Sequence, residues 1–75
     1  MKKIKIQSEY ITLGQFLKFV GLISFGGMAK EFIANHIIFV NQEKENRRGR
    51  KLYDNDRVKI DALEFLIVTD ENSKS

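Results

Sequence analysis

The 75-residue chain contains no cysteine and only one histidine, and these shortages exclude several kinds of site. Without cysteine the chain can form neither a disulfide nor a thiolate metal site, and its composition is compatible with a reducing compartment. The single histidine, His36, has no cysteine or second histidine with which to hold a metal ion. We therefore expect no metal site and interpret His36 as a residue at a helix end.

Long hydrophobic runs are also missing. No apolar run approaches the ~20 residues that a membrane-spanning helix needs. The segment Met1–Lys5 leads into a strand pattern and lacks the apolar region of a signal peptide. We expect a cytoplasmic monomer without a membrane partner, built as one small domain over residues 1–69 with a polar tail at 70–75. A chain of this length can bury one compact core.

Catalytic motifs are absent as well. The chain has no glycine-rich loop of the nucleotide-hydrolysing type and no pairing of a nucleophile with a base. Asp54 and Asp56 flank Asn55, a setting that favours a turn over acid–base catalysis. The sequence therefore predicts a protein that is not an enzyme, with no catalytic residue and no cofactor.

The hydrophobic pattern of the first third predicts one strand and one helix. Lys2 to Gln7 alternates between lysine and isoleucine, as in a half-buried strand. Thr12 followed by Gln15 forms a capping box, which predicts a helix start, and Gly21 predicts its end. The apolar face of this helix comprises Leu13, Phe16, Leu17 and Val20.

A second helix is predicted with Ser24 as its N-cap and His36 at its end. Its buried stripe would contain Ala29, Phe32 and Ile33. Gly26 and Gly27 fall in the predicted first turn, where each glycine disfavours a helix by about 1 kcal/mol. Two explanations remain open: close approach of a partner's anionic group to the backbone, or a tight connection between two packed helices.

The remaining residues predict strands and turns. The apolar run Ile37–Val40 predicts a strand buried on both faces, and Asn41 to Lys44 a turn or loop. Short strands are expected at Lys51–Tyr53, Arg57–Ile60 and Leu63–Thr69, with a turn at Asp54–Asp56. The order of elements predicts a small α+β domain, in which two short packed helices lie against a mostly antiparallel sheet.

A dense basic cluster lies between two of these strands. Four of the five residues from Arg47 to Lys51 are positively charged, and Gly49 separates two of the arginines. Guanidinium groups match phosphate oxygens in charge and geometry, and glycine allows close approach of the backbone. The alternative is a solvated loop that keeps the protein soluble. Acidic residues flank the cluster on both sides, which fits a small oriented patch better than a non-specific polyanion binder. These acids are Glu43 and Glu45 before the cluster and Asp54, Asp56 and Asp61 after it.

In order and spacing, these motifs resemble the S-four RNA-binding domain, also called the αL motif. The resemblance covers about residues 1 to 62 and is closest to the small stand-alone bacterial members of that superfamily. Its motifs are Thr12–Gln15, Ser24–Lys30, Ile38–Asn41, Glu45–Leu52 and Asp56–Ile60. Each motif is weak alone, but their combination is fairly specific.

The resemblance implies a non-catalytic protein that binds structured RNA, with ribosomal RNA as the expected partner and a role in ribosome assembly or translation. The implied contacts come from the edge of the second helix and from the basic loop. Asn41 either hydrogen-bonds RNA or, as we favour, stabilises a turn. The candidate RNA-binding residues are Ser24, Gly26, Gly27, Lys30, Asn41, Arg47, Arg48, Arg50 and Lys51.

Two departures from the family pattern and one alternative function remain. The pattern has glycine where His36 and Gln42 stand, so we expect a left-handed backbone at His36 and leave the turn after Asn41 open. The alternative function is a protein-interaction adaptor, whose basic loop binds an acidic partner, such as a ribosomal or assembly protein. Phe19 and Phe25 would then anchor the contact, although we favour packing at the core edge for them and for Tyr10 and Tyr53.

Overall fold

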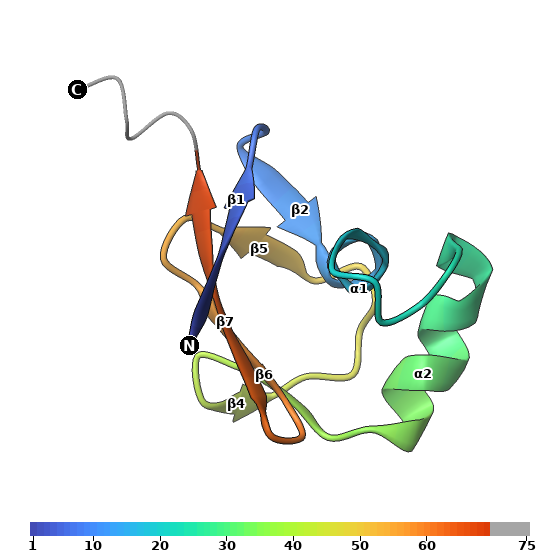
Figure 1. Cartoon of the computed structure of the whole chain (residues 1–75). Coiled ribbons are helices and arrows are strands. Elements are labelled where there is room, and N and C mark those ends of the chain that lie inside the picture. The colour runs from blue at the N-terminus through green and yellow to red at the C-terminus, as the bar shows by residue number, and fades with distance from the viewer. Residues whose placement is uncertain (70–75) are drawn as a thin grey trace.

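The computed structural model describes residues 1–69, and the tail predicted at 70–75 lies outside the described residues. These residues form an α+β fold in which two short helices lie to one side of the strands (Figure 1). The predicted fold class is thereby confirmed. The elements are β1 (Lys2–Ile6), β2 (Tyr10–Thr12), α1 (Leu13–Phe19), the 3-10 turn η1 (Gly26–Met28), α2 (Ala29–Asn35), β3 (Ile38–Val40), β4 (Glu43–Lys44), β5 (Lys51–Tyr53), β6 (Arg57–Ile60) and β7 (Leu63–Thr69).

The strands form two sheets. A five-stranded sheet has the order β1-β7-β6-β3-β4, and β2 pairs with β5 in a separate two-stranded ribbon. Only β1 and β7, near the two ends of the described chain, pair in parallel, while the other pairs are antiparallel. The short strands β2 and β4 were not predicted, because their pairing with β5 and β3, and not a pattern within their own residues, makes them strands.

Helix α1 begins and ends as its local sequence predicts. The Gln15 amide donates to Thr12 Oγ1 at 3.3 Å, and the Thr12 amide donates to Gln15 Oε1 at 3.1 Å, which completes the capping box. Gly21 has a φ of +83°, and the amides of Gly21 and Leu22 donate to the carbonyls of Lys18 and Leu17. This is the Schellman arrangement, which glycine accommodates without steric cost.

The start of the second helix differs from the prediction. Ser24 is not an N-cap, because Phe25 is extended and Gly26 to Met28 form a 3-10 turn, so that α2 starts only at Ala29. The low helix propensity of the two glycines accounts for this delay. His36 ends the helix as predicted, but its φ of −134° is extended, so the predicted left-handed backbone is wrong.

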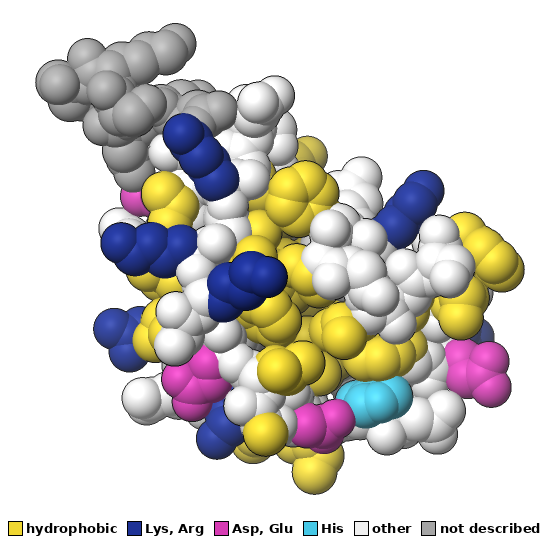
Figure 2. Space-filling model, viewed as in Figure 1, with side chains coloured by type: hydrophobic (Ala, Val, Ile, Leu, Met, Phe, Trp, Pro, Cys, Tyr) yellow, Lys and Arg dark blue, Asp and Glu magenta, His cyan; other side chains and the backbone are white. Residues whose placement is uncertain are grey.

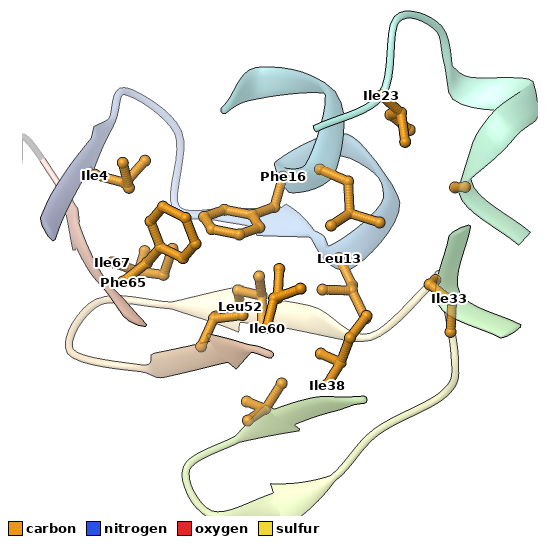
Figure 3. Close-up of a cluster of buried hydrophobic side chains, with 14 of the residues drawn as sticks. Ile4, Leu13, Phe16, Ile23, Ile33, Ile38, Leu52, Ile60, Phe65 and Ile67 are labelled. Carbon is orange, nitrogen blue, oxygen red and sulfur yellow. The ribbon is translucent and has the colours of Figure 1, made fainter. Parts of the chain in front are cut away.

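The core lies between the helices and the sheets. Leu13, Phe16 and Leu17 from α1 are fully buried, and the ring of Phe16 meets Phe65 of β7 edge-on at 5.2 Å between centroids (Figure 3). Ala29 and Ile33 are the buried positions of α2. The described hydrophobic residues therefore form one compact core that joins both helices to both sheets.

Several predictions of burial were wrong or only partly right. Phe32 packs against the core as predicted but is only half-buried, and its ring stacks on His36 with 3.8 Å between ring centroids. In the run Ile37–Val40, only Ile38 and Val40 are buried, since one face of β3 points away from the core. Phe19 and Phe25, predicted at the core edge, are 59% and 61% exposed.

Candidate nucleic-acid interface

The basic residues lie in a loop, residues 45–50, that joins β4 to β5 and is fixed at both ends. The Glu45 amide donates to the Ile38 carbonyl at 2.8 Å. The first amides of α1 hold the other end, because Leu13 and Gly14 donate to the carbonyls of Arg50 and Arg48, each at 2.8 Å. The loop is thus a fixed part of the fold, and α1 begins on its backbone.

Glu45 organises the loop from the inside. Its side chain is 5% exposed, and its two carboxylate oxygens accept bonds from Arg47 Nε at 2.9 Å, from Arg47 Nη2 at 3.1 Å and from Arg50 Nη1 at 2.7 Å. The backbone amides of Asn46 and Arg47 also donate to it. A buried carboxylate is tolerated where its lone pairs are satisfied in this way.

These bonds shift the pKa of the buried carboxyl. The hydrogen bond from the Arg47 side chain contributes most, burial opposes it, and the bond from Arg50 adds to it, so the pKa of Glu45 falls from 4.5 to about 2. Its carboxylate in turn raises the pKa of Arg47. Glu45 therefore stays charged across the physiological range and offsets part of the positive charge of the loop.

The four cations of the cluster consequently differ in availability. Arg47 keeps 70% of its side chain exposed while bonded to Glu45, whereas Arg50 is only 27% exposed. Arg48 is exposed and makes no ion pair with any residue of the described chain. Lys51 is not part of the loop but the first residue of β5, and its Nζ lies 4.9 Å from the centroid of the Tyr10 ring.

A groove of about 400 Å³ lies where the loop meets the helices. Arg48 and Gly49 form one side of it, and Lys18 of α1 and Gly26 of η1 contribute to the others. Arg48 also borders a neighbouring hollow with Lys30 of α2. Residues far apart in the sequence thus place three cations, Lys18, Lys30 and Arg48, around two neighbouring hollows that share Arg48, and we call the two hollows together the cationic groove. Its lining comprises Thr12, Gly14, Gln15, Lys18, Gly26, Ala29, Lys30, Ile33, Asn46, Arg48 and Gly49.

Two glycines of this groove, Gly26 and Gly49, have no evident role inside the chain. A Cβ atom added to Gly26 or Gly49 would meet nothing within 4 Å, and neither residue has a left-handed backbone. At Gly27 the nearest atom would be a ring carbon of Phe25, at 3.8 Å. Gly14 differs, because its Cβ would come within 3.4 Å of the Arg48 carbonyl and 3.5 Å of Ala29 Cβ. Only Gly14 is thus packed closely between α1, α2 and the loop.

The remaining predicted site residues lie outside the groove. Ser24 and Gly27 are close to Gly26 in the sequence, but neither residue lines the groove. Asn41 belongs to the turn between β3 and β4, on the side of the molecule opposite α2 (Figure 1). Its side chain donates to Asp56 Oδ1 and accepts from the Arg57 amide, both at 2.9 Å.

Lys18 was missed by the sequence interpretation, which considered only the apolar face of the first helix. It follows Gln15 by three residues and therefore lies on the same side of the helix. Helical periodicity of the polar positions could have identified it. The distance in sequence between Lys18 and Arg48 explains why their proximity could not be foreseen.

Basic side chains also occur elsewhere. In Figure 2 several lie over the half of the molecule that contains β1 and β7, away from the two helices. The residues described contain no group of three or more His, Cys, Asp or Glu side chains that could hold a metal ion. Over residues 1–69 no helix has the length and apolarity required to cross a membrane.

Comparison with known proteins shows the family to which the chain belongs. Residues 4–68 match the S4 domain family, which is nearly the whole described chain. The chain belongs to the S4 domain family. The resemblance drawn from the sequence motifs is thereby confirmed. This S4 domain chain is also 57% identical, over 60 residues, to a Bacillus subtilis (strain 168) protein named "Probable ribosome maturation protein RlbA"; the aligned region spans 80% of this chain and 84% of that protein.

Proposed function

We propose that this S4 domain protein binds structured RNA through the cationic groove and catalyses no reaction. The observation that carries the proposal is that cations without an ion pair in the described chain lie beside open glycines in the cationic groove. Arg48, Lys18 and Lys30 supply positive charge, while Gly26 and Gly49 leave room for a phosphate or ribose to approach the backbone.

The proposed chemistry follows from the residue types. Structured RNA is recognised mainly by shape, phosphates and 2′-hydroxyl groups. Arg48 can donate two parallel bonds to a phosphate, and the two lysines act as point charges. Arg47 adds an exposed guanidinium whose orientation Glu45 fixes. Arg50 is mostly buried, and its bond to Glu45 stabilises the loop. We assign Asn41 to the turn, because both ends of its amide are already bonded.

We further propose ribosomal RNA as the partner and ribosome assembly as the process, in the cytoplasm. Support for this step comes from the similar Bacillus subtilis protein, whose name refers to ribosome maturation. The groove suits a double-stranded or folded RNA segment more than a free nucleotide, since it is shallow and its cations are spread over α1, α2 and the loop.

Fluorescence anisotropy with a labelled ribosomal RNA hairpin and a DNA duplex of equal length tests the proposal. We expect tighter, salt-sensitive binding to RNA, reduced at least tenfold in the Lys30→Ala/Arg48→Ala variant. The control variant Lys3→Ala/Lys59→Ala removes the same charge from strands outside the groove and should bind normally. Loss of binding in both variants to the same extent would refute the assignment of the surface.

The exposed rings of Phe19 and Phe25 favour a second candidate, the protein-interaction adaptor. Phe25 directly precedes Gly26, which lines the groove together with Arg48, so an acidic partner could contact the ring and the basic loop together. The same titrations separate the two functions. An adaptor would leave RNA unbound even at low salt, and its binding to an assembly protein would depend on Phe25.

A further inference from the structure

The two-stranded ribbon of β2 and β5 presents an aromatic and basic face to solvent. Its inward residues are Ile11 and the fully buried Leu52, which pair across the strands. On the outward face Tyr10 lies opposite Tyr53, and Thr12 lies opposite Lys51. The two tyrosines are 36% and 43% exposed, although we had predicted core-edge packing for both. This face contains no aliphatic side chain.

The rings are held in place before any ligand binds. The centroids of Tyr10 and Tyr53 are 5.7 Å apart, with 51° between the ring planes, a tilted contact that stabilises cross-strand pairs. Lys51 Nζ lies 4.9 Å from the Tyr10 centroid, within range of a cation–π interaction. The Tyr53 amide donates to Asp56 Oδ2 at 2.7 Å, which fixes the end of β5. Tyr53 is the more exposed of the two residues, and its ring is supported by that of Tyr10.

The ribbon also adjoins the cationic groove. Thr12 lines the groove and pairs with Lys51, which directly follows the loop residue Arg50. Tyr53 lies two residues, or about 7 Å, beyond Lys51 along the strand. A nucleic-acid chain that leaves the groove over Lys51 would meet the Tyr53 ring next.

We propose that an unpaired nucleotide adjoining the bound RNA helix stacks its base on Tyr53. Tyr10 supports the ring, and Lys51 contacts the phosphate of that nucleotide. The inference rests on the RNA-binding function proposed above and specifies its ligand: a helix with a single-stranded extension. An anionic chain with aromatic bases matches this face, because tyrosine rings beside a cation bind bases with little sequence preference.

Three labelled RNA hairpins with the same stem test the proposal: one blunt, one with a three-nucleotide extension, and one with an abasic extension of equal length. Hairpins with 5′ and 3′ extensions are compared, because the direction of the RNA in the groove is open. We expect the extension on one side to tighten binding at least about fivefold, and the abasic form to lose that gain. Tyr53→Ala should abolish the gain while binding the blunt hairpin normally, and Tyr53→Phe should keep it.

Intrinsic fluorescence provides a site-specific readout. The chain has no tryptophan, and Tyr10 and Tyr53 are its only tyrosines, so its tyrosine emission reports on this ribbon alone. After correction for RNA absorbance, the extended hairpin should quench this emission more than the blunt or abasic one. Leu63→Ala, which truncates an exposed apolar residue in the turn region of β6 and β7, serves as the control and should behave as wild type.

The possible outcomes separate the two proposals. Equal affinity of the wild-type protein for the extended, abasic and blunt hairpins would overturn the stacking proposal and leave RNA binding intact. Failure to bind the blunt hairpin at low salt would overturn the proposed function itself. Because the abasic comparison uses wild-type protein, the result does not depend on how well the Tyr53 variants fold.

Discussion

At the scale of single residues, Glu45 connects the stability of the protein to pH. Its carboxylate is buried and accepts bonds from two arginines and two backbone amides. Because its folded-state pKa, about 2, is below the ordinary 4.5, the stabilisation is complete above pH 4.5 and is lost as the pH falls towards 2. The shift corresponds to at most about 3 kcal/mol, since Arg47 is largely solvated.

We therefore expect Glu45→Gln to lower the free energy of unfolding by about 1–3 kcal/mol at pH 7. The difference from wild type should shrink as the pH falls below 4.5 and vanish only below pH 2, where the Glu45 carboxyl is protonated in the folded protein as well. Urea unfolding at a series of pH values measures this. Glu43→Gln, which changes an exposed neighbour, is the control, and an equal pH dependence of the two variants would contradict the role of Glu45.

Gln42 has a left-handed backbone conformation that a glutamine side chain does not favour. Asn41 and Gln42 form the two-residue turn between β3 and β4 with φ values of 52° and 73°. Both values are left-handed, as in the turns that favour Asn-Gly. Asparagine tolerates this conformation, whereas glutamine has no such advantage. The family pattern, which has glycine here, thus reflects the turn type.

Gln42→Gly should stabilise the protein by about 0.5–1 kcal/mol, because relief of left-handed strain exceeds the entropic cost of glycine. For a domain of this size, the melting temperature should rise by about 2–8 °C. Gln42→Ala, which keeps a Cβ atom, should give no gain. A lower melting temperature for the glycine variant would show that the glutamine side chain stabilises the turn by another route.

At the scale of elements, α1, η1, α2 and the basic loop act as one unit. The amides of Leu13 and Gly14 bind the loop, and the close packing at Gly14 lets α1, α2 and the loop meet. By contrast, neither the packing nor the backbone conformation of the chain requires glycine at positions 26 and 49. The structure therefore does not support a tight helix connection as the reason for glycine at position 26. Close approach of the proposed RNA partner would explain glycine at both positions.

Replacing Gly26 and Gly49 with alanine should separate stability from binding. Each change should leave the free energy of unfolding unchanged or raise it by about 0.4–1 kcal/mol, because alanine restricts the unfolded chain and fits the native backbone. RNA affinity should nevertheless fall several-fold, since the added methyl groups occupy the groove. Anisotropy titrations and thermal unfolding provide the two readouts.

Gly21→Ala provides the matched control for that experiment. Its φ of +83° makes any Cβ strained, although open space surrounds it. This variant should lose stability while the RNA affinity of the folded protein stays unchanged. Unaltered RNA binding in the Gly26→Ala/Gly49→Ala variant would remove the main support for close approach in the groove.

At the scale of the whole molecule, the distribution of charge matters more than its total. The chain carries a formal net charge of +3, but one buried carboxylate offsets part of the basic loop, and further cations lie on β1 and β6. Binding should therefore depend on an oriented surface and not on net charge.

The salt dependence of RNA binding measures this orientation. If about four phosphates are contacted, the plot of log affinity against log salt should have a slope of about −3 to −4. Lys30→Ala/Arg48→Ala should reduce the magnitude of the slope by about 2, whereas Lys3→Ala/Lys59→Ala should leave it unchanged. An equal change in both variants would indicate diffuse attraction by the entire surface.

The sequence by itself determined the features that depend on neighbouring residues. The capping box of Thr12, the helix end at Gly21 and the strand Arg57–Ile60 were predicted correctly, because their signals act within a few residues along the backbone. The α+β class followed from the order of these elements. The S4 family followed from the spacing of its motifs.

Only the tertiary structure decided which side chains meet. Glu45 was predicted to be a flanking acid, but the fold buries it between Arg47 and Arg50. The cationic groove joins Lys18 to Arg48 across thirty residues of sequence, and the exposure of Tyr10 and Tyr53 depends on the pairing of β2 with β5. Such contacts form when the chain returns on itself, and local propensity carries no information about where it returns.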